Sequence, residues 1–235
     1  MTRPFDLITF DFDGVLLHSN FFDLYLDQCR AMGMQWPQEN EATLARFIHD
    51  YYASSIHLAN MEEHGREKYF PVANRRFLKA LGVDGEWDEQ IPTLIEQIRA
   101  AEVVYYYESR IHDLLEGLRE EGYRLAMLTN RDDRIHEFGA EWGMIEPFEL
   151  IITTSTTGKH KPDTAGFLYA NDYFDVPPSR SLHIGDNPYA DVRGAEAAGW
   201  SALLVDPDNL FPEWEVARVR SLSELRDWLA SQNGR

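Results

Sequence analysis

Short apolar runs alternate with helical stretches along most of this chain, and this alternation limits the folds that it can adopt. Six apolar runs, each bounded by turn residues, are found at 6–12, 123–129, 150–155, 181–186, 201–206 and 216–220. Strands that alternate with helices in this way pair in parallel, with helices on both faces of the sheet. The sequence therefore predicts an α/β, Rossmann-like fold with a mostly parallel sheet.

Residues 20–105 interrupt the alternation, because they contain helical patterns and no convincing strand. About 80 helical residues are too many for a simple crossover, since a strand–helix–strand unit takes ~30 residues. We therefore expect an all-helical domain at 20–105, inserted into an α/β core domain made of 1–19 and 106–235. Within the insert, Pro71 predicts that a helix breaks or begins at that position.

Two helix ends are expected from local signals in the core domain. Gly122 follows an amphipathic helical pattern, and a glycine at such a position is typical of a C-cap. Ser221 and Glu224 have the spacing of a capping box, so they predict the start of the last helix.

Charge and composition exclude several classes of function. The chain has 22 Lys and Arg residues against 40 Asp and Glu, a formal net charge of −18. A surface of this sign repels nucleic acid and anionic membranes, and no apolar run approaches the ~20 residues that cross a bilayer. Cys29 is the single cysteine, which favours a reducing, cytoplasmic location. Neither nucleic acid nor a membrane is an expected partner, and an anionic substrate would need local positive charge.

Polar residues follow the first two predicted strands at the points where these end. Asp11 and Asp13 are two residues apart, so they start ~7 Å apart and point the same way from an extended strand. Thr129 and Asn130 end the second strand. Ligands of open α/β sheets bind beyond the carboxyl ends of the strands, so these residues lie where chemistry is expected.

A lysine-containing loop and a second pair of acids follow the next two strands. Of only four lysines in the chain, Lys159 and Lys161 lie together in the loop after the third strand. Asp186 and Asp191 follow the fourth strand. Clustered carboxylates repel one another unless a proton or a cation neutralises them, and oxygen ligands suit Mg²⁺. Carboxylates that bind a metal and supply a nucleophile, with a hydroxyl and a lysine nearby, suit phosphoryl transfer.

The motifs DFDGV, LTN, KHKPD and GDNPYAD, in this order, resemble those of the haloacid dehalogenase superfamily in its phosphatase branch. The resemblance covers residues 4–19 and about 106–230, and the helical insert stands where such family members carry a cap domain. It implies a cytoplasmic, Mg²⁺-dependent phosphatase. Such an enzyme hydrolyses a small phosphorylated metabolite through an aspartyl-phosphate intermediate.

The resemblance also implies a role for each residue that contacts the substrate. Asp11 is the expected nucleophile. Asp13 is expected to protonate the leaving oxygen and then activate water. Thr129, with the backbone at Asn130, is expected to hold phosphoryl oxygens, and Lys161 is expected to balance the charge between the phosphoryl group and Asp11.

The metal site implied by the resemblance uses four acids. Asp186 would bind Mg²⁺ directly, and Asp191 would act through water or by orienting Lys161. Two alternatives stay open from the residues alone: Lys159 exchanging roles with Lys161, and Asp191 capping the helix that follows it. The expected Mg²⁺ ligands are Asp11, the backbone carbonyl of Asp13, Asp186 and Asp191.

Several other functions are compatible with the same motifs. A phosphomutase of the same family would use them all, and a non-catalytic binding protein could retain the fold. Haloacid dehalogenation is a weaker alternative, because Asp13 supplies an acid that a halide leaving group does not need. The sequence leaves the phosphorylated substrate and the oligomeric state open.

Overall fold

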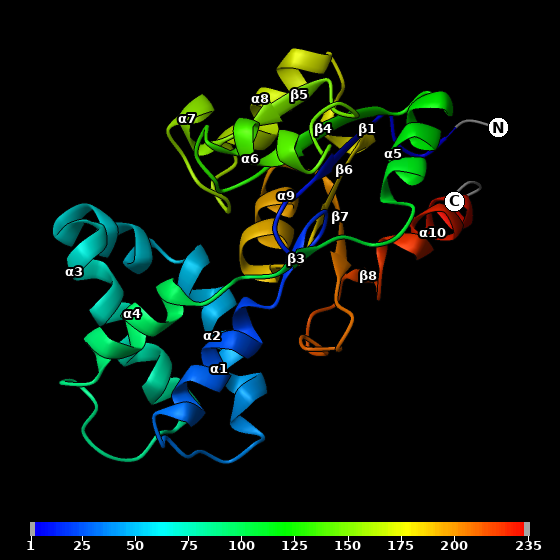
Figure 1. Cartoon of the computed structure of the whole chain (residues 1–235). Coiled ribbons are helices and arrows are strands. Elements are labelled where there is room, and N and C mark those ends of the chain that lie inside the picture. The colour runs from blue at the N-terminus through cyan, green and yellow to red at the C-terminus, as the bar shows by residue number, and fades with distance from the viewer. Residues whose placement is uncertain (1–2, 233–235) are drawn as a thin grey trace. The chain divides into compact units, whose positions relative to one another are not determined.

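The computed structural model describes residues 3–232, without the side chains of 55, 56, 58–64, 66 and 67. The chain divides into two compact units, Met1–His18 with Tyr106–Arg235, and Ser19–Tyr105. The first unit contains the sheet and the second is helical (Figure 1). We describe each unit by itself, and call them the α/β unit and the helical unit.

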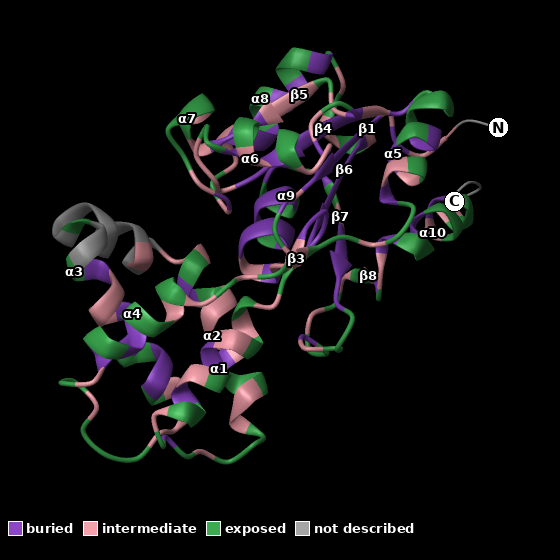
Figure 2. Cartoon of the chain, viewed as in Figure 1, coloured by how far each residue is buried: buried purple, intermediate pink, exposed green. Residues whose placement is uncertain are grey.

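Six parallel strands form the sheet of the α/β unit, in the order β5-β4-β1-β6-β7-β8. They are β1 (Leu7–Phe10), β4 (Arg124–Leu128), β5 (Leu150–Ile152), β6 (Ser181–Gly185), β7 (Ser201–Val205) and β8 (Ala217–Val219). Each strand lies within one of the six apolar runs, and the predicted α/β fold with a mostly parallel sheet is confirmed. The central strands β1, β4 and β6 are almost wholly buried, as Figure 2 shows in purple. Burial on both faces explains why they read as continuous apolar runs.

Helices lie on both sides of this sheet (Figure 1). The helices of the α/β unit are α5 (Ile111–Glu120), α6 (Ile135–Glu141), α7 (Thr154–Thr157), α8 (Ala165–Phe174), α9 (Arg193–Ala197) and α10 (Leu225–Gln232). The α/β unit also contains three short helical segments of other types, η1 (Pro178–Arg180), η2 (Pro188–Val192) and η3 (Leu222–Glu224). Apolar residues of α8 and α9 pack with Leu7, Ala126 and Ile152 in one core cluster, which includes the fully buried Phe167.

The two predicted helix ends have different outcomes. Gly122 adopts φ +87° and closes α5, as predicted. The capping box at the start of the last helix is wrong, because the Ser221 hydroxyl pairs with that of Ser223 instead. The carboxylate of Glu108 accepts the amides of Leu222 (2.9 Å) and Ser223 (3.2 Å). An acid from before α5 therefore satisfies the amides at this helix start.

The helical unit contains α1 (Phe21–Ala31), α2 (Asn40–Ala53), α3 (Ser55–Leu81) and α4 (Ile91–Ala100) around its own apolar core. The prediction of a break or a start at Pro71 is wrong, because α3 continues through this residue. The interruption lies at Gly65, with φ 64° and ψ 168°. Proline keeps a φ that a helix tolerates, whereas glycine reaches positive φ without a steric cost. Among the helices of the described residues, none is both long and apolar enough to cross a membrane.

The two ends of the inserted segment are held side by side. The short strands β2 (His18–Ser19) and β3 (Tyr105–Tyr106) pair with each other. Next to them, the Asn20 amide donates to the Val104 carbonyl (3.1 Å), and the Val104 amide donates to Asn20 Oδ1 (2.9 Å). The segment therefore leaves and re-enters the sheet-forming chain at one place.

We predict that Phe167→Ala lowers the free energy of unfolding by about 3–5 kcal/mol, because it opens a cavity against the sheet. Tyr173→Ala, on the same helix α8, is the matched control: Tyr173 is 54% exposed, and we expect a loss below about 1 kcal/mol. Urea-induced unfolding followed by circular dichroism measures both. Equal losses for the two variants would contradict the packing described here.

Candidate active site

The strand ends that carry the candidate residues surround the middle of the sheet. β1 lies between β4 and β6, and the chain continues from β4 to β5 on one side and from β6 to β7 on the other. Such a reversal of strand order creates a crevice at the carboxyl ends of the strands. Asp11 directly follows β1, and its amide donates to the Ile184 carbonyl of β6 at 2.8 Å. The backbone at Asp11 is therefore fixed at this reversal.

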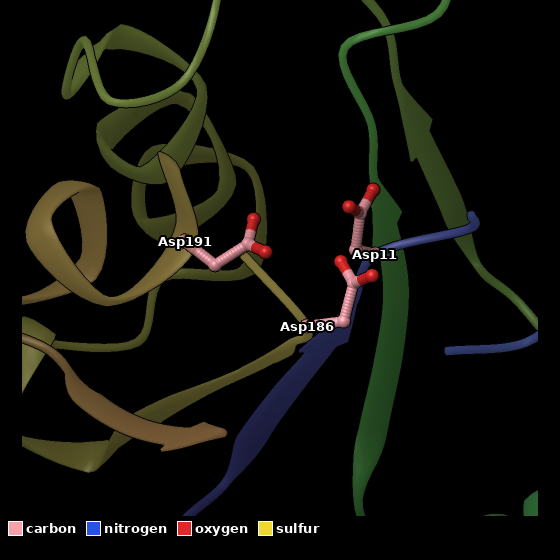
Figure 3. A group of neighbouring side chains, drawn as sticks. All are labelled: Asp11, Asp186 and Asp191. Carbon is pink, nitrogen blue, oxygen red and sulfur yellow. The ribbon is translucent and has the colours of Figure 1, made fainter. Parts of the chain in front are cut away.

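Three carboxylates meet at the reversal, as Figure 3 shows, and we call them the acidic cluster: Asp11, Asp186 and Asp191. One oxygen of each lies within 4.8 Å of the others. Two glycines make room for them. A Cβ at Gly14, which has φ +73°, would lie 1.9 Å from Asp186 Oδ2, and a Cβ at Gly185 would lie 2.2 Å from Asp191. Neither position therefore has room for a side chain.

Lys161 is the buried cation of this site. Its Nζ lies 3.0 Å from Asp11 Oδ1 and 2.7 Å from Asp191 Oδ1, and it donates to the Leu128 carbonyl at 2.8 Å. These three acceptors match the three hydrogens of an ammonium group. Burial acts to lower the pKa of Lys161, but the charges of Asp11 and Asp191 outweigh burial and raise it. Lys159 is exposed, so the structure brings Lys161 and not Lys159 to the carboxylates.

Asp191 is held by donors on both oxygens. Besides Lys161, Oδ1 lies 3.1 Å from His183 Nε2, and Oδ2 accepts the Asn187 amide at 2.9 Å. Burial acts to raise the pKa of Asp191, but the Lys161 charge and the His183 hydrogen bond lower it. Because an ionised Asp191 only accepts, His183 Nε2 donates to it, and Nδ1 accepts from the Thr9 hydroxyl at 2.8 Å. Asp191 does not cap the helix that follows it, because the N-cap position of α9 is Val192 and has no side-chain cap hydrogen bond.

The negative charges of the other two carboxylates of the acidic cluster, Asp11 and Asp186, are less well compensated than that of Asp191. Burial raises the pKa of Asp11 to about 7 despite the opposing charge of Lys161. Burial and the charge of Asp11 raise the pKa of Asp186 well above its ordinary value. Within the described part of the chain, no hydrogen-bond donor to the Asp186 carboxylate is found. When all three carboxylates are ionised they leave two negative charges in excess over the one ammonium, and oxygen donors of this kind fit Mg²⁺.

Asp13 is not part of the acidic cluster. Its carboxylate makes a two-bond ion pair with Arg131, Nε to Oδ2 at 2.7 Å and Nη2 to Oδ1 at 2.6 Å. The guanidinium lies over the rings of Phe12 (5.4 Å) and Phe138 (4.9 Å). The Asp13 side chain is 52% exposed and that of Arg131 is 34% exposed. The pair thus forms the accessible side of the site.

Thr129 and Asn130 connect the site to the Lys161 loop. Thr129 is buried, and its Oγ1 accepts the Arg131 amide at 3.2 Å. The Asn130 side chain accepts the Lys161 amide (2.7 Å) and donates to the Lys161 carbonyl (3.1 Å). This side chain therefore orients the lysine loop, which leaves the Asn130 backbone for the phosphoryl contacts expected of it.

Two residues of the site were missed by the sequence reasoning, Arg131 and His183. His183 and Thr9 are polar residues in buried apolar strands, and they are partners in the β1–β6 register. Because buried polar groups are almost always hydrogen-bonded, this pair of positions was a usable signal for a buried polar network. Arg131 directly follows the LTN motif but lies outside it.

Comparison with known proteins identifies the family of the chain. Residues 5–199 match the family described as haloacid dehalogenase-like hydrolase. The chain is 34% identical over 137 residues to a phosphoserine phosphatase of Thermus thermophilus, covering 58% of this chain and 55% of that protein. It is 35% identical over 99 residues to haloacid dehalogenase-like hydrolase domain-containing protein 3 of Bos taurus, covering 42% and 39%. The chain thus aligns with between about a third and just over half of the length of such curated relatives.

A solved structure shares the whole fold. The hydrolase YfnB of Bacillus subtilis, bound to magnesium, superposes with a TM-score of 0.59 at 20% identity, covering 97% of this chain and all of that one. The likeness in fold extends over both units, and the sequence match spans β1 to α9 with all of the motif residues. On these grounds the chain belongs to the haloacid dehalogenase-like hydrolase family.

Proposed function

We propose that this protein is a Mg²⁺-dependent phosphatase that hydrolyses a small phosphorylated metabolite through an aspartyl-phosphate intermediate. The observation that carries the proposal is the position of Asp11, a buried carboxylate held by Lys161 beside two other acids at the reversal of the sheet. The partial similarity to a phosphoserine phosphatase is consistent with this chemistry.

Asp11 is oriented for nucleophilic attack. Its Oδ1 accepts the Phe12 amide at 2.8 Å and faces Lys161, which fixes the carboxylate plane. In the proposed first step, an Asp11 oxygen forms a bond to phosphorus while the ester P–O bond breaks, and Asp13 gives its proton to the leaving oxygen. In the second step Asp13 takes a proton from water, and the water oxygen attacks phosphorus. The acyl-phosphate P–O bond then breaks, which releases inorganic phosphate and restores Asp11.

The remaining residues of the proposed site would bind the metal ion, orient Lys161 or bind phosphoryl oxygens. We propose that Asp11, Asp186 and the Asp13 backbone carbonyl hold Mg²⁺, which when bound neutralises negative charge on phosphoryl oxygens. Asp191 would contribute through water or by orienting Lys161. The Thr129 hydroxyl and the Asn130 backbone would donate to phosphoryl oxygens.

The helical unit has a role in the same proposal. Residues 20–105 would act as the cap that excludes water from the reaction and selects the substrate. This unit has its own core of buried aromatic and aliphatic side chains. It can therefore act as a body distinct from the sheet.

We predict that Asp11→Asn reduces turnover by at least about 10³-fold, because an amide cannot replace the nucleophilic carboxylate. The fold should persist, since the substitution removes a buried charge that faces Asp186 and Asp191. Phosphate release from phosphorylated sugars, nucleotides and three-carbon acids with Mg²⁺ measures the rate, and circular dichroism checks the fold. Asp113→Asn, at an exposed position of α5, is the control. A near-wild-type rate for Asp11→Asn would disprove the assignment.

Mg²⁺ binding should strengthen as pH rises from 5 to 8. The pKa of Asp11 is raised to about 7 and that of Asp186 is raised well above normal, so their protonated forms favour folding. The stabilisation of the fold by these protonated side chains is fully present near pH 4 and is lost as pH rises through 7. Above this pH Mg²⁺ takes the place of the protons. We expect Mg²⁺ to raise the midpoint of thermal unfolding more at pH 8 than at pH 5, and Asp186→Asn to remove most of this effect. Equal shifts at both pH values would count against the site.

Gly14→Ala should weaken Mg²⁺ binding and activity together, because the added methyl group would displace the Asp186 carboxylate. Gly33→Ala is the matched control, since Gly33 also has a positive φ, +84°, but no atom lies within 4 Å of its Cβ position. We expect both variants to lose about 1 kcal/mol from backbone strain. Only Gly14→Ala should require more Mg²⁺ for half-maximal activity. A similar requirement in both variants would show that backbone strain alone causes the effect.

A further inference from the structure

We propose that Arg131 binds a carboxylate carried by the leaving group of the substrate, and that this carboxylate takes the place of Asp13 on the guanidinium. The substrate would then be a small phosphorylated carboxylic acid. The inference rests on the proposed function, because it concerns how Asp13 becomes available to the leaving oxygen.

The ion pair keeps Asp13 away from the reaction. Both carboxylate oxygens accept from Arg131, at 2.7 and 2.6 Å, so the carboxylate is oriented by the guanidinium and not by a group at Asp11. The Asp13 carboxylate also lies outside the acidic cluster. For Asp13 to act on the leaving group, this pair must open.

Arg131 is better anchored than its partner. Its guanidinium lies over Phe12 and Phe138, and its amide donates to Thr129 Oγ1 at 3.2 Å. The Asp13 side chain is the more exposed of the two, 52% against 34%. When the pair opens, we therefore expect Asp13 to move while the guanidinium stays on the two rings.

The vacated position favours one kind of group. Arg131 presents Nε and Nη2 to the two oxygens of one carboxylate, the geometry in which a planar guanidinium binds carboxylates best. Exchange of the Asp13 carboxylate for one on the substrate keeps both hydrogen bonds and the local charge. A neutral substrate offers no such exchange, so it would leave Asp13 bound to Arg131.

The short separation of Thr129 and Arg131 in the sequence favours a small substrate. Arg131 follows Thr129, an expected phosphoryl contact, by only two residues, and its amide donates to Thr129 Oγ1 at 3.2 Å. We therefore expect the phosphate ester and the carboxylate of the substrate to be separated by only one or two carbon atoms.

Two matched pairs of compounds test the proposal. Phosphoglycolate is compared with 2-hydroxyethyl phosphate, and 3-phosphoglycerate with glycerol 3-phosphate, so that each pair differs in the carboxylate. We expect the full-length wild-type protein with Mg²⁺ to prefer the acid of at least one pair by about tenfold or more in kcat/KM. Arg131→Met should reduce this ratio to near one, because the acid loses its partner on the guanidinium and the neutral compound has no such partner to lose.

The variants are chosen to separate charge from packing. Methionine retains an apolar contact with Phe12 and Phe138, and Arg131→Gln gives a second measurement if Arg131→Met does not fold. Arg134→Met is the control, because Arg134 is an exposed arginine that pairs with Asp132, and it should keep the wild-type ratio. An equal loss on both members of each pair in the Arg131 variants would overturn the proposal.

The outcomes also separate this inference from the proposed function. Wild-type hydrolysis of both members of each pair at similar rates would overturn the carboxylate site and leave the phosphatase function standing. Hydrolysis of p-nitrophenyl phosphate but of none of the four compounds would have the same meaning. Failure on p-nitrophenyl phosphate and on all other phosphate esters would overturn the phosphatase function itself.

Discussion

The buried ammonium of Lys161 is the interaction on which the site depends. It joins four separate parts of the chain, since it contacts Asp11 after β1, the Leu128 carbonyl of β4 and Asp191 after β6, and comes itself from the loop after α7. A buried charge is tolerated only when its partners are complete. Without this cation, Asp11 and Asp191 would face each other uncompensated. Residues of four separate segments therefore meet one electrostatic requirement, the compensation of this buried ammonium.

The sheet was predictable from the sequence because its strands are buried on both faces and read as apolar runs. Contacts between residues that are far apart in the sequence were not predictable. The start of η3 and α10 is capped by Glu108, 114 residues before Leu222, and no local pattern around Ser221 indicates this. The break in α3 falls on Gly65, where the backbone has φ 64°, and not on Pro71, because proline keeps a φ that a helix tolerates.

Within the site, the ends of the predicted strands indicated where the residues lie better than they indicated which side chains pair with each other. Asp11, Lys161 and Asp191 come together because each follows a strand or lies in the loop after one, and the sheet brings these ends together. Which side chain faces which depends on packing. The pairing of Asp13 with Arg131 follows from the two rings beneath the guanidinium, and these rings come from segments 126 residues apart.

The pairing of β2 with β3 has a consequence for how such a protein diversifies. Because the inserted segment starts and finishes at adjacent points, its length and internal folding can change without shifting the register of any neighbouring strand. If the helical unit selects the substrate as proposed, its helices can be rebuilt for a new one while the residues at the strand ends stay in place. The helical unit and the strand-end site can then change separately in evolution.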